Sequence, residues 1–167
     1  MNQTTWTAPY VYSGPGLLGF DIAGPLNAPS GQFIGVGGTS ITLDSLSDSI
    51  ADITTNAVGN TDVRMYILEV PTLELIASSD SSTIPVYNIS TLSRIVTTKA
   101  QDDLVSTTAQ FLNASGFPHG QVFVTSGNFL QSRSYTDNYG LDWRIVTIQE
   151  IDCDPGFFVG PDNRTWW

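Results

Sequence analysis

The sequence predicts an α+β protein in which an antiparallel sheet with helices on one face is preceded by a partial second sheet. Two observations lead to this prediction. First, residues 43–57 have the period of an amphipathic helix, which divides the chain into two parts. Second, the pattern after residue 60 predicts the order strand, strand, helix, strand, strand, strand. The length of 167 residues leaves room for one domain, or for one small domain and part of another.

A strand followed directly by a helix connects the two halves of the chain. Residues 33–43 alternate in polarity, are rich in β-branched residues and contain glycines, which predicts a strand that other atoms approach closely. Apolar residues then recur every three or four positions, at Leu43, Leu46, Ile50 and Ile53. Because negative charge also stands in the first turn, where the helix dipole favours it, a helix is expected here.

The residues before this helix predict only part of a sheet. The turn-forming segment 27–31 lies between the strand-like runs 17–23 and 33–43, which predicts an antiparallel pair. Two strands alone are marginally stable in water. This first sheet therefore needs further strands.

Five strand-like runs and one long helical period follow residue 60. The first two runs form a hairpin around a Pro-Thr turn, and a helical period from residue 89 to residue 113 separates them from the other three. This order predicts one five-stranded antiparallel sheet with helices on one side. The runs are residues 64–70, 73–79, 121–125, 128–135 and 141–151.

The net charge of -10 argues against two classes of partner. Six Lys and Arg residues against sixteen Asp and Glu leave no basic patch, so we expect no binding to nucleic acid or to an anionic membrane surface. No apolar run approaches the ~20 residues that span a bilayer, so no membrane insertion is expected within this chain. The first residues lack the basic and apolar regions of a signal peptide, so an export signal would have been removed or would lie elsewhere.

Four Asn-x-Ser/Thr sequons predict an extracellular or cell-surface glycoprotein. Because Ser and Thr make up over a fifth of the chain, its nine asparagines would give roughly two sequons by chance, and four is a modest excess. Glycosylation is predicted at Asn2, Asn88, Asn113 and Asn163.

Cys153 is the only cysteine in the chain. An unpaired cysteine in an exported chain usually has its partner elsewhere, which makes Cys153 a candidate for an intermolecular disulfide. The alternative is an inert, buried thiol.

No set of residues in the sequence matches a catalytic, metal or cofactor site. The single histidine, His119, stands beside Pro118 and Gly120 without partners at catalytic or metal-ligating spacing. The neighbours Asp102 and Asp103 would point in different directions on a helix, which favours a solvated face. Zinc, EF-hand and phosphate-binding patterns do not occur. The sequence therefore predicts a protein that is not an enzyme and has no cofactor and no metal.

Three stretches carry a resemblance to a known family. The first joins TTWTAPY to LGFDIAGPLNAPSGQFIGVGGTSITLDSLSDSI, where a Trp and a Pro-Tyr pair precede a Gly-Val strand and a Leu-x-x-Leu helix. The second, RMYILEVPTLELIASS, ends in Ile-Ala-Ser-Ser, and the third, TDNYGLDWRIVTIQEID, contains Gly-Leu-x-Trp. In this order they resemble the extracellular double Cache sensor family, whose ectodomains stack two PAS-like modules joined by a helix.

The resemblance implies a division of the chain. Residues 1–58 would be the end of a first, partial Cache-like module with its connecting helix, and residues 59–152 a complete second module. Residues 153–167 would be a tail, and DCDPGFFVGP at its start resembles the first step of a cysteine-rich receptor stalk. A simple Gly/Pro-rich tail is the alternative. The missing part of the first module implies a fragment, a processed protein, or a member that borrows strands.

The resemblance also implies ligand-binding residues. Family members that bind amino acids use the Tyr of the Pro-Tyr pair and an Asp at the end of the Gly-Val strand. Tyr10 matches the first, whereas Ser40 occupies the second position and the upstream Arg-x-Trp part has no counterpart. In the second module, a set of polar and aromatic residues would line a pocket, and the alternative for them is a structural role on the sheet surface or in turns. These are Tyr66, Ser78, Arg133, Tyr135 and Asp137.

The function implied is that of a non-catalytic extracellular module, the ligand-sensing ectodomain of a membrane receptor, with a small molecule as its partner. The alternative is a structural glycoprotein subunit of an extracellular assembly or filament. An unfinished sheet exposes unpaired strand edges, and such edges accept a strand from a neighbouring copy. Self-association would then replace the small molecule as the main interaction.

Overall fold

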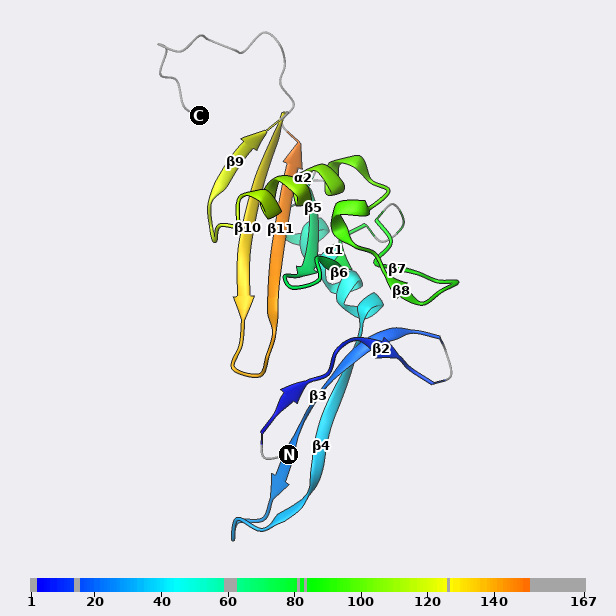
Figure 1. Cartoon of the computed structure of the whole chain (residues 1–167), viewed down its shortest axis with the longest axis vertical. Coiled ribbons are helices and arrows are strands. Elements are labelled where there is room, and N and C mark those ends of the chain that lie inside the picture. Colours follow the sequence, from blue (N-terminus) through cyan, green and yellow to red (C-terminus); the bar gives the residue numbers. More distant parts are fainter. Residues whose placement is uncertain are drawn as a thin grey trace.

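Two antiparallel sheets and two α-helices make up most of the described part of the chain (Figure 1). The computed structural model describes residues 3–13, 16–58, 63–80, 82, 84–125 and 127–150. Helix α1 (Leu43–Val58) joins the two sheets. Sheet A consists of β1 (Thr5–Trp6), β2 (Tyr10–Val11), β3 (Leu18–Asn27) and β4 (Phe33–Thr42). Sheet B consists of β5 (Val63–Glu69), β6 (Glu74–Ser78), β9 (Val122–Thr125), β10 (Asn128–Thr136) and β11 (Asp142–Glu150).

Strand β3 is the centre of sheet A. It pairs with β4 along one edge, and with β1 and β2 along the other. Phe20 lies opposite Ile41 and the next residue, Asp21, lies opposite Ser40, so neighbouring positions of β3 serve opposite faces of the sheet. The predicted antiparallel pair is confirmed, and its turn uses Gly31 at a φ of 83°.

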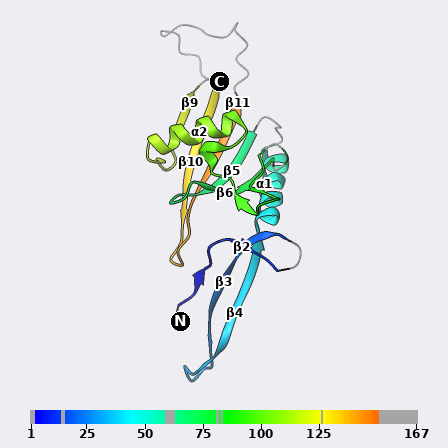
Figure 2. The same cartoon turned by 45° about the vertical axis from the view of Figure 1, so that its right-hand side comes forward.

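Strands β3 and β4 extend as a ribbon beyond the rest of the molecule (Figures 1 and 2). Within the described residues, β4 pairs with β3 alone. Large apolar side chains near the tip are exposed, with 57% for Phe33, 65% for Ile34 and 66% for Val36. Because residues 22–43 include no charged residue, this edge of sheet A is long, apolar and open to solvent.

Helix α1 begins without a loop, at the residue after β4 ends. Thr42 caps its N-terminus, since its Oγ1 accepts a hydrogen bond from the Ser45 backbone N–H at 3.1 Å, and Leu43 is fully buried. Further along, Ser47 Oγ accepts a hydrogen bond from the Ser78 backbone N–H at 3.2 Å. This contact fixes α1 beside β6, the edge strand of sheet B.

Sheet B contains most of the core. Its strand order is β6-β5-β11-β10-β9 with antiparallel neighbours, which confirms the predicted five-stranded sheet. Helix α2 (Asp103–Ala114) covers one face (Figure 2), where Tyr66 on β5 shares a hydrogen bond with Thr108 at 3.2 Å. Each large apolar side chain buried here contributes about 1.5–3 kcal/mol relative to an exposed position. Fully buried examples are Leu68, Leu112, Leu130, Val146 and Ile148.

The helical period predicted over residues 89–113 is wrong in its first half. Only α2 is an α-helix there, and it is preceded by the 3-10 turn η1 (Thr97–Lys99) and by the strand pair β7 (Tyr87–Asn88) and β8 (Ser93–Arg94). Leu92 has a φ of 50°, which is incompatible with a continuous helix. A run of β-branched residues follows it and favours extended backbone.

An ion pair holds this segment against sheet B instead. Arg94 is 11% exposed at its side chain and contacts the carboxylates of Glu69, at 2.8 Å, and of Glu74. Val96 forms an isolated bridge with Glu74 at the same edge. These contacts join residues far apart in sequence, so tertiary pairing overrides the local helical period.

Asp102 does not lie on a solvated face, in contrast to the prediction. Its Oδ1 accepts a hydrogen bond from the Val105 backbone N–H at 2.9 Å and caps α2, while its Oδ2 accepts one from Arg64 at 2.6 Å. Its neighbour Asp103 is exposed. The two carboxylates therefore have different roles, and only Asp103 fits the predicted solvated position.

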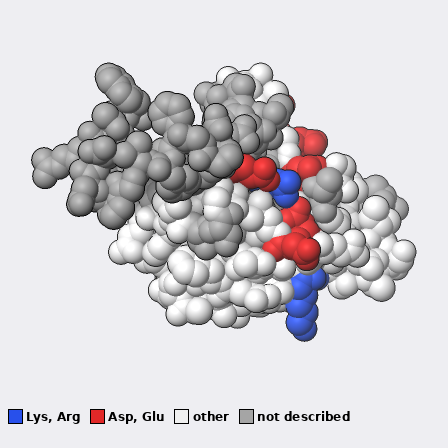
Figure 3. All heavy atoms as spheres, turned by 90° about the horizontal axis from the view of Figure 1, so that it is seen from above, with Lys and Arg blue, Asp and Glu red and all other residues white. Residues whose placement is uncertain are grey.

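Charged side chains are sparse on the surface. Figure 3, which views the molecule from above, shows acidic and basic side chains in one band among uncharged surface. Neither described helix is long and apolar enough to cross a membrane. In the part of the chain that the structure describes, no three His, Cys, Asp or Glu side chains are grouped to hold a metal ion.

Candidate ligand-binding sites

One carboxylate on sheet A accepts hydrogen bonds from two tyrosines. Tyr10 donates its hydroxyl to Asp21 Oδ2, and Tyr12 donates its hydroxyl to Asp21 Oδ1 at 2.9 Å. The two tyrosine rings contact edge to face, with centroids 4.9 Å apart. The Asp21 backbone N–H donates to Thr7 Oγ1 at 2.9 Å, which fixes the strand at this point. We call Tyr10, Tyr12, Asp21 and the facing Ser40 the tyrosine–aspartate site.

Asp21 is held in its charged form at neutral pH. The Tyr10 hydroxyl, with help from the hydroxyls of Ser40 and Tyr12, holds the pKa of Asp21 below its usual value. The same hydrogen bond to Asp21 raises the pKa of Tyr10 to about 12, so this phenol stays neutral. Burial raises the pKa of Tyr12 as well. The site therefore offers one negative charge and two neutral hydroxyls.

No basic residue of the same part of the chain compensates this charge. Residues 1–58 contain four Asp and no Lys, Arg or His. Asp21 belongs to none of the ion pairs formed within the described ranges. A charged carboxylate that has only neutral hydroxyls as side-chain partners suits an ammonium group, because the ammonium group supplies the opposite charge.

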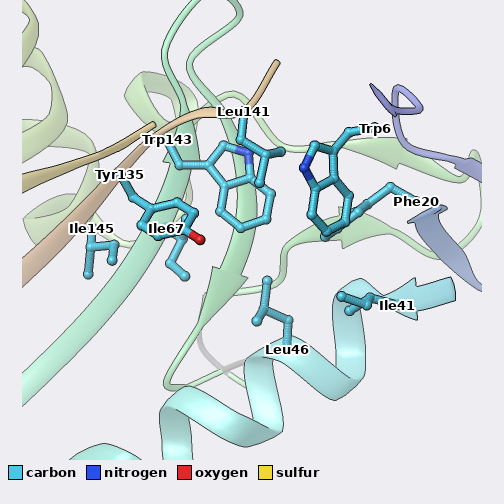
Figure 4. Close-up of a pocket in the computed structure, with 9 residues that line it drawn as sticks. All are labelled: Trp6, Phe20, Ile41, Leu46, Ile67, Tyr135, Leu141, Trp143 and Ile145. Atoms are coloured by element: carbon cyan, nitrogen blue, oxygen red, sulfur yellow. The ribbon is translucent and has the colours of Figure 1, made fainter. Parts of the chain in front are cut away.

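A second candidate site lies between the two sheets, and we call it the junction pocket. It is a cavity of about 280 Å³. Figure 4 shows Trp6 and Phe20 of sheet A on one side of the hollow and Tyr135 and Trp143 of sheet B on the other. Leu46 of α1 lies between them at the base in this view.

Aromatic contacts and hydrogen bonds connect the two sides of the junction pocket. Phe20 contacts Trp6 and Trp143 edge to face, with centroid distances of 5.5 and 5.4 Å. Trp6 Nε1 donates to Asp137 Oδ2 at 2.7 Å, and the Trp6 backbone N–H donates to the Tyr139 carbonyl at 3.4 Å. The N-terminal segment is thereby fastened to the turn between β10 and β11.

Three of the six predicted ligand-binding residues lie at these sites. Tyr10 belongs to the tyrosine–aspartate site, Tyr135 lines the junction pocket, and Asp137 holds Trp6 at the pocket. Tyr135 and Asp137 are thus brought together at the junction pocket. Tyr10 lies on the face of sheet A that is turned away from this pocket.

The other three lie apart from both sites. Tyr66 is fully buried under α2, and this burial raises the pKa of its phenol. Ser78 is buried opposite Tyr66 in the β5–β6 pair, and Arg133 is exposed on β10. Their assignment to a ligand site stays a prediction.

The predicted modification sites are only partly described. Asn88 in β7 and Asn113 near the end of α2 are exposed. The single histidine, His119, for which no catalytic or metal-ligating role was predicted, accepts a hydrogen bond on Nδ1 from the Ser134 backbone N–H at 3.0 Å. Asn2, Asn163, Cys153 and the predicted tail at residues 153–167 lie outside the described residues.

Sequence reasoning missed two residues that organise these sites. Asp21 was detectable, because the predicted pairing across the turn at residues 27–31 sets it opposite Ser40, the position that lacks the expected Asp. Trp6 gave no local signal as a pocket residue, since its partner Asp137 is 131 positions away in sequence.

No family model and no curated protein matches the chain. Several solved structures are similar to this chain. One is an extracellular ligand binding receptor from Desulfohalobium retbaense, with a TM-score of 0.51, 15% identity, and coverage of 89% of this chain and 22% of that chain. The ligand-binding domain of the Pseudomonas aeruginosa PAO1 amino acid chemoreceptor PctC, in complex with GABA, gives 0.49 at 16% identity and covers 88% and 54%. That of the Pseudomonas fluorescens chemoreceptor CtaA, in complex with L-serine, gives 0.49 at 13% and covers 90% and 56%.

The predicted α+β class is confirmed by the antiparallel sheets and two α-helices of the described residues. The match with a TM-score of 0.51 shows that the extracellular ligand binding receptor contains the same fold. The present chain spans little more than half the length of the two chemoreceptor domains and about a fifth of the receptor chain.

Proposed function

We propose that this chain is a non-catalytic, extracellular ligand-sensing module that binds a small molecule through its ammonium group at the tyrosine–aspartate site. The observation that carries the proposal is the Asp21 carboxylate, which accepts two tyrosine hydroxyls and has no Lys, Arg or His in residues 1–58. An ammonium group would supply the missing positive charge.

The position of Asp21 supports this ligand class. It lies opposite Ser40 in the β3–β4 pair. The family resemblance implies a carboxylate at the end of the Gly-Val strand, at the position of Ser40. In this chain, Asp21 of the neighbouring strand would supply that carboxylate instead. The PctC and CtaA domains were solved in complex with GABA and L-serine, and these complexes suggest ligands with which to test binding. The proposal that the ligand binds through an ammonium group rests on the chemistry of Asp21.

Calorimetric titration with γ-aminobutyrate, n-butylamine and butyrate tests the proposal. The first two carry an ammonium group and are expected to bind, whereas butyrate is not. Asp21→Asn keeps the shape of the side chain and removes its charge, so amine affinity should fall at least about tenfold. Asp48→Asn removes a carboxylate from the exposed face of α1 and is the matched control. Equal affinity in the parent protein and Asp21→Asn, or equal binding of butyrate and n-butylamine, would contradict an ammonium site.

The extracellular receptor context is the second part of the proposal. In it, residues 1–58 are the end of one module, residues 59–152 form the next, and the signalling output lies outside this chain. Asn88 and Asn113 are exposed and within sequons, so both are proposed to carry glycans. Glycopeptide mass spectrometry on protein from a eukaryotic source should detect them, and two unmodified asparagines would refute this part.

A structural role is the second candidate function, and the open edge of β4 favours it. In the described residues β4 has no partner beyond β3, and it lacks the Lys and Pro residues that commonly protect edge strands. A neighbouring copy would then add a strand there. Sedimentation velocity should reveal polymers that Ile34→Lys dissolves and that Ile53→Lys, an exposed position on α1, does not. A protein that stays monomeric at all concentrations would exclude this role.

A further inference from the structure

We propose that the junction pocket is a second binding site, which takes a small, neutral, flat apolar molecule. This site is separate from the tyrosine–aspartate site and does not depend on it. Phe20 lines the junction pocket, and its neighbour Asp21 carries the polar site, so the two sites lie on opposite faces of β3.

The volume of the junction pocket limits the size of its occupant. About 280 Å³ is well above the roughly 150 Å³ of an apolar cavity that binds benzene, and close to the lower end, about 300 Å³, of ordinary small-molecule pockets. One ring or two fused rings therefore fit.

The walls select a neutral occupant. Every lining side chain is aromatic or aliphatic, and Trp6, Phe20, Tyr135 and Trp143 supply the rings. The nearby carboxylate of Asp137 accepts the Trp6 Nε1 hydrogen at 2.7 Å. A charged ligand would lose its hydration here without gaining a partner. A neutral aromatic ring instead gains edge contacts of the kind that Phe20 already makes with both tryptophans.

The occupant would touch both sheets at once. Trp6 belongs to β1, Trp143 to β11, and Leu46 to the helix that joins the sheets. Binding should therefore stabilise the attachment of sheet A to sheet B, because a ligand stabilises the conformation to which it binds. Amide exchange in β1 and β3 should slow when the pocket is filled.

Saturation-transfer NMR with indole tests the proposal on the intact chain. Indole is neutral and bicyclic, and we expect a Kd of about 0.1–1 mM. Leu46→Trp places a large ring in the pocket and should weaken indole binding at least about tenfold. Ile53→Trp adds the same ring to the same helix at a position that is 50% exposed, and should leave the Kd within about twofold of the parent. Saturating n-butylamine should also leave the indole Kd unchanged.

Three outcomes would overturn the proposal. They are the absence of saturable indole binding up to about 5 mM, an unchanged Kd in Leu46→Trp, and competition between indole and n-butylamine. If circular dichroism shows that Leu46→Trp does not fold, Ile41→Phe fills the pocket from β4 and must give the same loss. If n-butylamine does not bind but indole does, the proposed ammonium site is refuted and the proposed junction-pocket site stands. The two proposals can therefore be distinguished.

Discussion

Sheet A and sheet B use the same antiparallel pairing but differ in what covers them. In sheet B, helix α2 lies over one face, and the side chains of Leu130, Val146 and Ile148 beneath it are fully buried. In sheet A, most of β4 is exposed, and apolar burial is confined to the end of β3 near sheet B, at Leu18 and Phe20. Sheet B therefore contains the core, and sheet A depends on its contacts with sheet B.

Because of this difference, we expect sheet B to determine the stability of the fold and sheet A to take part in binding. Both candidate sites include residues of sheet A, the part with fewer buried contacts, and ligand-binding segments are commonly drawn from the less stable parts of a fold. Substitutions in sheet B should have large effects on the whole chain. Substitutions in sheet A should have small effects that remain local.

The largest loss of stability is expected from a cavity in sheet B. Leu130→Ala truncates a fully buried side chain and should lower the free energy of unfolding by about 2–5 kcal/mol, measured by urea denaturation. Leu26→Ala, at a position of sheet A that is 51% exposed, is the matched control and should change it by less than about 0.5 kcal/mol. Similar losses in both variants would remove the contrast between the sheets.

A smaller loss is expected at the edge of sheet B. Arg94→Met leaves the carboxylates of Glu69 and Glu74 without their shared partner, and these are only about a quarter exposed at their side chains, 27% and 28%. We expect a loss of about 1–3 kcal/mol, because solvent partly screens the two carboxylates. Arg133→Met, at an exposed position, is the control. A loss below about 0.5 kcal/mol would mean that the ion pair does not hold this segment.

The attachment of sheet A should weaken without loss of the core in Trp6→Phe. This change keeps a ring in the junction pocket and removes the hydrogen bond from Trp6 Nε1 to Asp137, at a cost of about 1 kcal/mol. Amide exchange should become roughly fivefold faster in β1 and β3 and stay unchanged in sheet B. Tyr139→Phe, which alters only an exposed hydroxyl, is the control. Uniform acceleration in both sheets would show that they unfold together.

The smallest effect on stability is expected on acidification of the tyrosine–aspartate site. The folded pKa of Asp21 is lowered by the hydroxyls of Tyr10, Ser40 and Tyr12. Its contribution to stability is therefore fully present above the unfolded pKa of about 3.9 and is lost as the pH falls through the folded pKa. Affinity for n-butylamine should be constant from about pH 7 to 5 and be lost only as the pH falls below about 3.9, through the lowered folded pKa. Loss of affinity already near pH 6 would indicate that another group controls binding.

Local patterns in the sequence predicted most elements. The helix after Thr42 and the five strands of sheet B follow from apolar periodicity and turn residues, and they occur within a few residues of the expected bounds. The segment around Arg94 was predicted wrongly, because its extended backbone depends on Glu69 and Glu74, which lie on other strands. Contacts of this kind leave no periodic signal.

The candidate sites were predictable to a smaller extent. Three site residues were identified. Tyr10 came from the family resemblance, and Tyr135 and Asp137 were named as aromatic and polar residues of the second module. Asp21 followed from strand register and was still missed. The junction pocket was not predictable, because it requires the packing of Trp6 and Phe20 against Trp143 across the two sheets.

The direct passage from β4 into α1 has a mechanical consequence. No flexible residue separates the strand from the helix, and both Thr42 and Leu43 are fixed, the first by its cap and the second by burial. Rotation of β4 about its long axis must therefore rotate the first turn of α1. Since Ser47 in the next turn holds the backbone of β6, a torque applied to the ribbon is transmitted to the edge of sheet B that lies beside α1.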